Sequence, residues 1–202
     1  MPADFNWAIG GEAGDGIDST GKIFAQALSR AGRHVFTSKD FASRIRGGYT
    51  AYKIRTSIDP VQSVVDRLDV LIALTPRTID ENLEELHEGS VIIYDGERTT
   101  MANVEIPEGM TGLDVPLKRL AEEAGGAIMR NVVALGAACA VTGFPIENLD
   151  SALDKRFASK GQALVDNNKE AARSGQDYVA EEYDVDAGYS LETTDADYVL
   201  LN

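Results

Sequence analysis

Short, continuously apolar runs alternate with helical patterns along most of this chain, and this alternation constrains its fold more than any other feature. The clearest run covers 69–75, with Val-Leu-Ile-Ala-Leu at its centre. Other candidate strands cover 5–9, 34–38, 49–56, 90–95 and 111–115, and candidate helices run from residue 17 to Gly32, from 76 to Gly89, and over 117–124, 131–141, 146–153 and 160–182. Strands that are apolar on both faces are typical of parallel sheets covered on both sides. The sequence therefore predicts an α/β fold: a three-layer, mostly parallel sheet with helices on both faces.

Composition fits a globular protein with a proper core, at 202 residues with 44% hydrophobic and 26% charged. No apolar run approaches the roughly 20 residues that a membrane span needs, and the N-terminus has neither the basic nor the apolar region of a signal peptide. The lone cysteine, Cys139, cannot form an intrachain disulfide, and with His34 and His87 it makes no metal site of known spacing. We expect a reducing, cytoplasmic setting.

The charge balance is strongly acidic, with 19 Lys+Arg against 33 Asp+Glu and a formal net charge of −14. Binding of nucleic acid or of anionic membranes by the bulk surface is disfavoured, because both depend on basic patches. A dispersed acidic surface instead predicts a halophilic protein, since salt screens its self-repulsion. A melting temperature that does not rise between low salt and molar KCl would contradict this.

A glycine-rich turn over 10–16 follows the first apolar run and precedes a helical pattern, an order typical of dinucleotide-binding folds. The register argues against a nicotinamide site: counting from Gly11, the middle glycine of G-x-G-x-x-G is Ala13, although Gly16 takes the last place. Glu12 and Asp15 also put carboxylates where a phosphate needs positive charge, while the helix N-terminus itself favours an anion. The sequence favours a tight turn that packs helix on strand, with some anion contact.

The segment 43–48 reads Ser-Arg-Ile-Arg-Gly-Gly and leads into a candidate strand. Arg44 and Arg46 carry planar donor forks suited to phosphate or carboxylate. Gly47 and Gly48 let the backbone approach a ligand or partner closely. The segment is either an ordinary surface loop with two solvated arginines or a functional surface that faces a partner domain or a bound cofactor.

The other candidates have structural interpretations that are at least as good as functional ones. His34 heads a strand and favours a structural or surface role over that of a base. His87 is placed to interact with the C-terminal dipole of a helix. Cys139 lies in an apolar helical pattern and is expected to be a small core residue. Asn131 either caps its helix, which is the favoured interpretation, or presents its amide to a ligand. No catalytic constellation is visible.

An ordered set of these motifs resembles the gamma domain of the 2-oxoacid:ferredoxin oxidoreductases, over most of residues 5–180. The motifs are Gly-Glu-Ala-Gly-Asp-Gly-Ile over 11–17, Gly-Lys-Ile over 21–23, Ser-Arg-Ile-Arg-Gly-Gly over 43–48 and Arg-Asn-Val-Val-Ala-Leu-Gly over 130–136. The departures are Ala13, where the family often has glycine, and Asp15, where it often has glutamine. They put in doubt any ligand contact carried over to that loop.

The resemblance implies a component of an enzyme that oxidatively decarboxylates a 2-oxoacid to acyl-CoA and CO₂ while reducing ferredoxin. The gamma domain is associated with coenzyme A binding and complex assembly, whereas thiamine diphosphate and iron–sulfur clusters belong to partner domains or subunits. The resemblance implies alpha and beta partners, contact with ferredoxin through the complex, and no nucleic-acid or membrane partner. The cofactor-binding candidates are then Gly11, Gly14, Gly16, Arg44, Arg46, Gly47, Gly48 and Asn131.

The expected organisation is a gamma domain over 1–182 and an acidic tail, or a linker to a following domain, over 183–202. Since one branch of the family fuses the gamma domain to an alpha domain, a gamma–alpha fusion is the expected origin. The isolated chain is expected to be inactive, because it has too few cysteines to hold a cluster. Two alternatives stay open: a stand-alone α/β nucleotide-binding or regulatory module, and an NAD-dependent dehydrogenase.

Overall fold

The computed structural model describes residues 4–41, 48–184 and 191. In chain order the elements are β1 (Asp4–Glu12), α1 (Ile17–Arg30), β2 (His34–Phe41), β3 (Tyr49–Ser57), β4 (Leu68–Ala73), α2 (Pro76–Asn82), β5 (Leu86–Tyr94), β6 (Thr111–Asp114), α3 (Leu117–Glu123), η1 (Ala127–Met129), α4 (Arg130–Thr142), α5 (Ile146–Phe157), η2 (Ala158–Lys160) and α6 (Gln162–Glu182).

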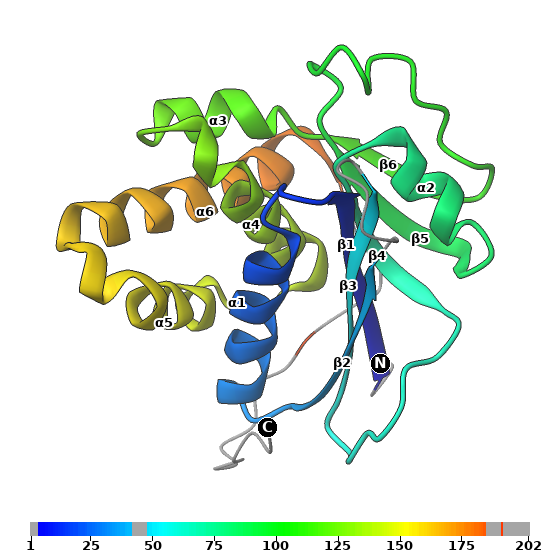
Figure 1. The fold of residues 1–202 in the computed structure, drawn as a ribbon, viewed down its shortest axis with the longest axis horizontal. Helices are drawn as coiled ribbons and strands as arrows, with labels where there is room; N and C mark the ends of the chain where they lie inside the picture. The colour runs from blue at the N-terminus through cyan, green and yellow to red at the C-terminus, as the bar shows by residue number, and fades with distance from the viewer. Residues whose placement is uncertain (1–3, 42–47, 185–190, 192–202) are drawn as a thin grey trace.

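One six-stranded sheet, ordered β2-β3-β1-β4-β5-β6, forms the middle of the molecule (Figure 1). β1, β4, β5 and β6 are mutually parallel, and β3 is antiparallel to both β1 and β2. β3 therefore runs against the other five strands, and the predicted mostly parallel α/β sheet is confirmed. The carboxyl ends of those five strands consequently meet at one edge of the sheet.

Helices cover both faces of the sheet, as predicted, but unequally (Figure 1). Side chains from α1, α3, α4, α5 and α6 share the larger core with alternate strand residues such as Trp7, Ile54 and Ile72. On the opposite face, Ile79 of α2 joins Leu71 and Ile92 in a smaller cluster. The loop after β5 supplies the rest of that second cover, through residues such as Met101.

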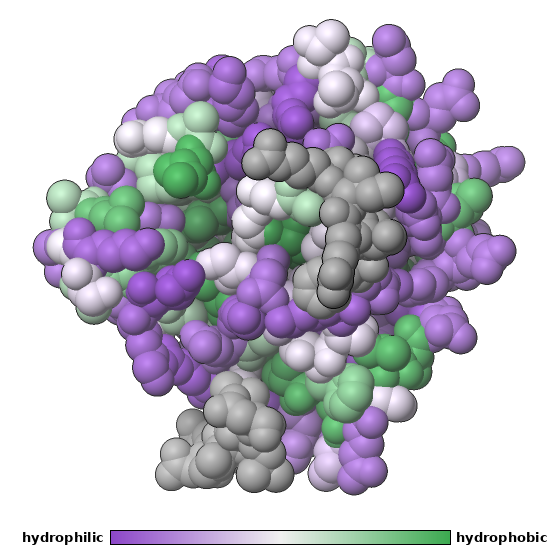
Figure 2. Space-filling model, in the orientation of Figure 1, coloured by the Kyte–Doolittle hydropathy of each residue, from purple (hydrophilic) through white to green (hydrophobic). Residues whose placement is uncertain are grey.

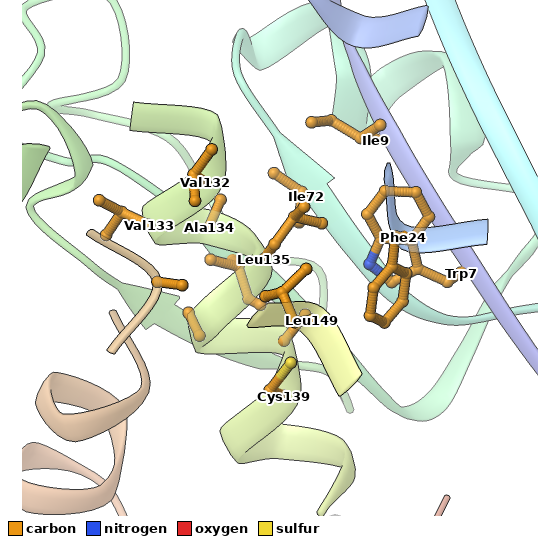
Figure 3. Packing of buried hydrophobic residues seen from close by; sticks show 14 of the residues in the cluster. Trp7, Ile9, Phe24, Ile72, Val132, Val133, Ala134, Leu135, Cys139 and Leu149 are labelled. Atoms are coloured by element: carbon orange, nitrogen blue, oxygen red, sulfur yellow. The ribbon is translucent and has the colours of Figure 1, made fainter. Parts of the chain in front are cut away.

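The larger core is built on aromatic and aliphatic contacts between sheet and helices (Figure 3). The rings of Trp7 and Phe24 lie 5.0 Å apart, and Phe144 meets Phe24 edge-on at 5.9 Å. Such pairs add about 0.5–1.5 kcal/mol beyond the burial of their surface. Cys139 is fully buried, which confirms the prediction for it, and burial raises the pKa of its thiol.

Helices α4 and α6 cross with their backbones in contact. A β-carbon at Gly136 would lie 1.7 Å from the Ala172 carbonyl oxygen, and one at Gly175 would lie 2.0 Å from the Val133 carbonyl oxygen. Neither position can carry a side chain unless the helices separate, because the obstructing atoms are backbone. The small residues therefore fix how α4 lies in the helical layer.

The main local error of the sequence prediction is at the boundary between α2 and β5. The helix was expected to continue to Gly89, but it ends at Asn82, and β5 begins at Leu86 rather than at residue 90. β4 and β5 pair with a register shift between Leu68 and Val70, which leaves an irregular bulge over 87–90. His87 therefore lies in a strand, and its predicted role beside a helix end is wrong.

The face shown in Figure 2 is mainly polar, and its apolar residues form small separate areas. Among the described residues, no helix combines the length and the apolar character that crossing a bilayer requires. Beyond α6, Leu191 is buried in the larger core, and its N–H donates to the Thr142 carbonyl at 2.9 Å.

Candidate functional site at the carboxyl edge of the sheet

The glycine-rich turn over 10–16 lies at the edge where the five co-directional strands end, the usual place for ligands in sheets of this kind. It connects β1 to α1. The residue before β3 arrives at the same edge, because β3 runs in the opposite direction: the Ala13 N–H donates to the Gly48 carbonyl at 3.0 Å. The two glycine motifs of the sequence therefore meet here.

Hydrogen bonds within the turn fix its shape. The Asp15 N–H donates to the Glu12 carbonyl, and the Glu12 N–H donates to Asp15 Oδ2, both at 3.0 Å. Gly14 and Gly16 have φ values of 106° and 80°, which favour glycine over residues with a side chain. A β-carbon at Gly11 would lie 3.0 Å from Asp15 Oδ2, so the absence of a side chain there lets the carboxylate fold back onto the turn.

The N–H groups of Glu12 and Asp15 are thus used within the turn and that of Ala13 by Gly48, but two others are not used. No hydrogen bond joins the N–H groups of Gly14 or Gly16 to a described residue, and both glycines are exposed. Gly16 also occupies the N-cap position of α1 and has no side-chain cap, so the positive end of a 14-residue helix faces the same place. Free N–H groups at a helix N-terminus can hold a phosphate or carboxylate.

The first turn of α4 clamps this loop from the side. Arg130 Nη2 donates to Asp15 Oδ1 at 2.5 Å. The Asp15 carboxylate, whose negative charge was counted as unfavourable for a bound phosphate, is therefore paired with a cation. Asn131 Nδ2 donates to the Asp15 carbonyl at 2.7 Å and to Thr20 Oγ1 at 3.1 Å. Loop, α1 and α4 are therefore joined across more than 100 residues of sequence.

Asn131 has a different role from the helix cap that was favoured for it. α4 begins one residue earlier, at Arg130, and its N-cap residue is Met129, which makes no side-chain cap. Asn131 is buried, and its Oδ1 has no hydrogen-bond partner among the described residues. Its amide nitrogen holds the loop, while its oxygen is left as a spare acceptor beside it.

The structure brings together five of the eight predicted site residues: Gly11, Gly14, Gly16, Gly48 and Asn131. Arg44, Arg46 and Gly47 lie outside the described residues. Sequence reasoning missed the clamping roles of Arg130 and Thr20. The one signal for Arg130 was its place directly before Asn131 in the motif over 130–136, because Asp15 lies far from it in the sequence.

The exposed side chain of Ala13 explains why the loop tolerates a residue other than glycine there. Its N–H is engaged by Gly48, and no hydrogen bond that shapes the turn involves its side chain. Within 4–41, 48–184 and 191, no group of three His, Cys, Asp or Glu side chains is placed so that it could hold a metal ion.

Comparison with known proteins gives a consistent result. The family model described as "Pyruvate ferredoxin/flavodoxin oxidoreductase" matches residues 6–178. Ketoisovalerate oxidoreductase subunit VorA of Methanothermobacter marburgensis is 30% identical over 173 residues, which are 84% of this chain and 35% of VorA. The 2-oxoglutarate synthase subunit KorC of Archaeoglobus fulgidus is 25% identical over 78% of this chain and 81% of its own length. The chain thus spans about a third of VorA but most of KorC.

Solved structures share the fold. A 2-oxoglutarate:ferredoxin oxidoreductase from Magnetococcus marinus, with 2-oxoglutarate, coenzyme A and succinyl-CoA bound, matches 96% of this chain and 34% of its own, with a TM-score of 0.86 and 29% identity. The gamma subunit of a keto/oxoacid ferredoxin oxidoreductase from Geobacter sulfurreducens matches 89% of this chain and 98% of its own, with a TM-score of 0.77 and 27% identity.

Proposed function

The chain belongs to the pyruvate ferredoxin/flavodoxin oxidoreductase family, and from this premise we propose that it is the gamma domain of a 2-oxoacid:ferredoxin oxidoreductase. The proposed reaction converts a 2-oxoacid, coenzyme A and two oxidised ferredoxins into acyl-CoA, CO₂ and two reduced ferredoxins. Alpha and beta subunits or domains are its proposed partners, and ferredoxin meets the complex rather than this chain alone. A cytoplasmic, high-salt setting fits the net charge of −14.

The chemistry of electron transfer is assigned to the partners, because this chain does not fit a cluster. An iron–sulfur cluster needs several thiolates, and the single cysteine, Cys139, is fully buried in the helical layer. Thiamine diphosphate is likewise assigned to a partner. The chain's own contribution is to bind and orient coenzyme A and to help assemble the complex.

One observation carries the assignment of coenzyme A: the exposed turn keeps the N–H groups of Gly14 and Gly16 at the N-terminus of α1, and Ala13 of the turn bonds Gly48, the last residue of the Arg-Gly-Gly segment. A coenzyme A phosphate placed there would accept from these N–H groups. The arginines of 43–48 would supply the positive charge that the turn lacks. The proposed contact residues are Gly11, Gly14, Gly16, Arg44, Arg46, Gly47, Gly48 and Asn131, with Asn131 supporting the loop.

Binding to the isolated chain tests this contact. Thermal shift with coenzyme A, NADH and ATP separates the proposal from the nicotinamide and nucleotide alternatives, since a ligand at about 100 times its Kd stabilises by about 2.7 kcal/mol. Replacing Arg46 with Gln should weaken coenzyme A binding by more than about 1 kcal/mol and leave stability within about 0.5 kcal/mol. Arg156→Gln is the matched control, because Arg156 is exposed on α5 and, among the described residues, contacts only the Ser19 hydroxyl and the ring face of Phe157. An Arg46 variant that unfolds more easily but binds coenzyme A normally would show instead that this arginine stabilises its own loop through internal ion pairs.

Activity tests the wider proposal. The isolated chain should reduce no dye acceptor with pyruvate or 2-oxoglutarate, whereas a complex reconstituted with alpha and beta partners should. Turnover by the chain alone would overturn the assignment of the cofactors to partners.

A further inference from the structure

A second pocket opens at the carboxyl edge, where β5 ends, and it is separate from the glycine-rich turn. Its volume is about 580 Å³, and it lies between residues 95–100 and the first turn of α3. Small-molecule sites typically enclose about 300–1,000 Å³. The pocket is therefore large enough for a ligand, and every residue that lines it is polar or charged.

The wall formed by residues 95–101 is held in place by its own hydrogen bonds. The Arg98 N–H donates to the Asp95 carbonyl at 3.2 Å, and the Met101 N–H donates to the Arg98 carbonyl at 2.8 Å. Met101 is 1% exposed and anchors the loop in the smaller core cluster. On the inner side, the Gly96 N–H donates to Asp114 Oδ1 at 2.6 Å. The pocket thus needs no ligand to form, which lowers the entropic cost of binding.

Arg98 supplies a half-buried cation to this pocket. Its Nη1 donates to the Leu74 carbonyl at 2.7 Å, which orients the guanidinium. Among the described residues no carboxylate lies within ion-pair distance of it, whereas the neighbouring Arg119 pairs with Glu97 and Glu123. A guanidinium has five N–H donors, so Arg98 keeps most of them for a bound anion.

Asp95 supplies the complementary acceptor. It is 3% exposed, its Oδ2 accepts the Lys118 N–H at 3.0 Å, and its Oδ1 has no hydrogen-bond partner among the described residues. Burial raises the pKa of this carboxyl group. A buried acceptor without a partner costs about 1–3 kcal/mol, and a donor on a ligand would remove that cost.

We propose that this pocket binds a small hydroxylated anion, whose phosphate or carboxylate group lies on Arg98 and whose hydroxyl group donates to Asp95 Oδ1. A bare metal cation is disfavoured because Arg98 lines the same pocket, and a bare anion would leave Asp95 unsatisfied. Thr99 and Thr100 add hydroxyl groups at the rim. The pocket shares no lining residue with the proposed coenzyme A contact, and the two are linked only through Leu74, which accepts from Arg98 and donates to the Gly10 carbonyl.

Titration of the ¹⁵N-labelled chain tests the site, with ribose 5-phosphate as the probe and with gluconate, ribose and inorganic phosphate as comparisons at fixed ionic strength. Amide shifts should change at 95–100 and 118, and ribose 5-phosphate or gluconate should bind at least about tenfold more tightly than ribose or phosphate alone. Whichever of the two binds better identifies the anionic group. Equal affinity for ribose 5-phosphate, gluconate and inorganic phosphate, or shifts spread over the surface, would overturn the proposal.

Substitutions at Arg98 and Asp95 test the two proposed ligand contacts separately. Arg98→Gln should weaken binding of the preferred probe at least about tenfold, Arg98→Lys should weaken it less, and Asp95→Asn should remove the preference over inorganic phosphate. Arg156→Gln is again the matched control and should change nothing. Asn131→Ala should also leave this pocket unaffected, which separates it from the glycine-rich turn. An Arg156 variant that loses as much affinity as the Arg98 variant would show that binding is only diffuse charge attraction.

Discussion

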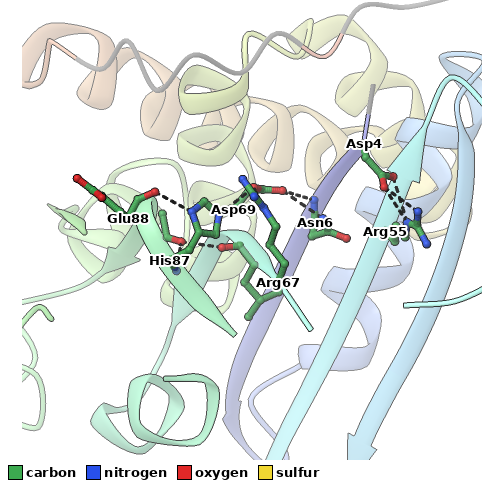
Figure 4. Close-up of polar contacts among 9 residues, drawn as sticks. Asp4, Asn6, Arg55, Arg67, Asp69, His87 and Glu88 are labelled. Atoms are coloured by element: carbon green, nitrogen blue, oxygen red, sulfur yellow. Dashed lines mark hydrogen bonds and ion pairs between the residues drawn. The ribbon is translucent and has the colours of Figure 1, made fainter. Parts of the chain in front are cut away.

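The two ends of the sheet carry polar clusters of opposite character. At the amino end Asp69 is 2% exposed, and both of its carboxylate oxygens are engaged (Figure 4). Oδ2 accepts the backbone N–H of Asn6 at 2.8 Å, and Oδ1 accepts Arg67 Nε and His87 Nε2, both at 3.1 Å. At the carboxyl edge, Asn131 and Asp95 are also buried, but each has one oxygen without a partner among the described residues.

This difference separates a structural polar cluster from a candidate binding surface. Buried polar groups are nearly always hydrogen-bonded, so each unsatisfied one calls for an explanation. The Asp69 cluster joins β1, β4 and β5 and needs nothing further. The carboxyl edge combines spare acceptors with the free N–H groups of Gly14 and Gly16, and its internal bonds orient these groups without satisfying them.

The largest effect should come from breaking the amino-end cluster. Asp69→Ala leaves Asn6 without its acceptor and His87 without its carboxylate, so we expect a loss of about 2–4 kcal/mol in the free energy of unfolding. Urea denaturation measures this, and the labelling rate of the buried Cys139 gives a second readout. Asp154→Ala, which removes an exposed ion pair with Lys169, should cost less than about 1 kcal/mol. Similar losses for the two variants would show that the Asp69 cluster is not structural.

The equivalent change at the carboxyl edge should cost less stability. Asn131→Ala removes two hydrogen bonds but also removes the unpaired oxygen, so we expect a loss of about 1–2 kcal/mol. The loop should become more mobile, and hydrogen exchange at Asp15 and Glu12 should speed up more than exchange in the sheet. Uniformly faster exchange across the protein would contradict a local clamp.

Two glycines provide a matched test of the comparison. Gly14 at the carboxyl edge and Gly89 in the amino-end bulge have φ values of 106° and 89°, and a β-carbon at either position would meet no atom within 4 Å. Alanine at each should therefore cost a similar amount, about 1–2 kcal/mol, through backbone strain alone. Only Gly14→Ala should also weaken the thermal shift with coenzyme A. A reduction of equal size in the Gly89 variant would remove the functional distinction between the two ends.

The smallest expected effect is the pH dependence of Asp95. Because its folded pKa is raised, its contribution to stability is fully present below the ordinary Asp pKa of 3.8 and is lost as pH rises through the folded value. Asp95→Asn should therefore gain stability relative to the parent between pH 4 and pH 7, by no more than about 1 kcal/mol. Urea midpoints at both pH values measure the difference, and a difference that shrinks towards pH 7 would contradict the sign.

The elements that were predicted correctly from the sequence are those that neighbouring residues determine. Buried strands such as β4 are continuous apolar runs, and the glycine-rich turn lies directly between a strand and a helix. The boundary between α2 and β5 was missed because the bulge at His87 is stabilised by Asp69, which comes from another strand. The clamp on the loop was missed for the same reason, since Asp15 and Arg130 are 115 residues apart.

Helix α4 also has a mechanical consequence. Its first residue, Arg130, holds Asp15, and the carbonyl of its last residue, Thr142, accepts the N–H of Leu191. Thirteen residues at 1.5 Å each make a rod of about 20 Å. The backbone contact at Gly136 prevents this rod from sliding along α6 without parting the helices. A force that acts on the chain at Leu191 would therefore be transmitted along α4, as along a rigid body, to the glycine-rich turn.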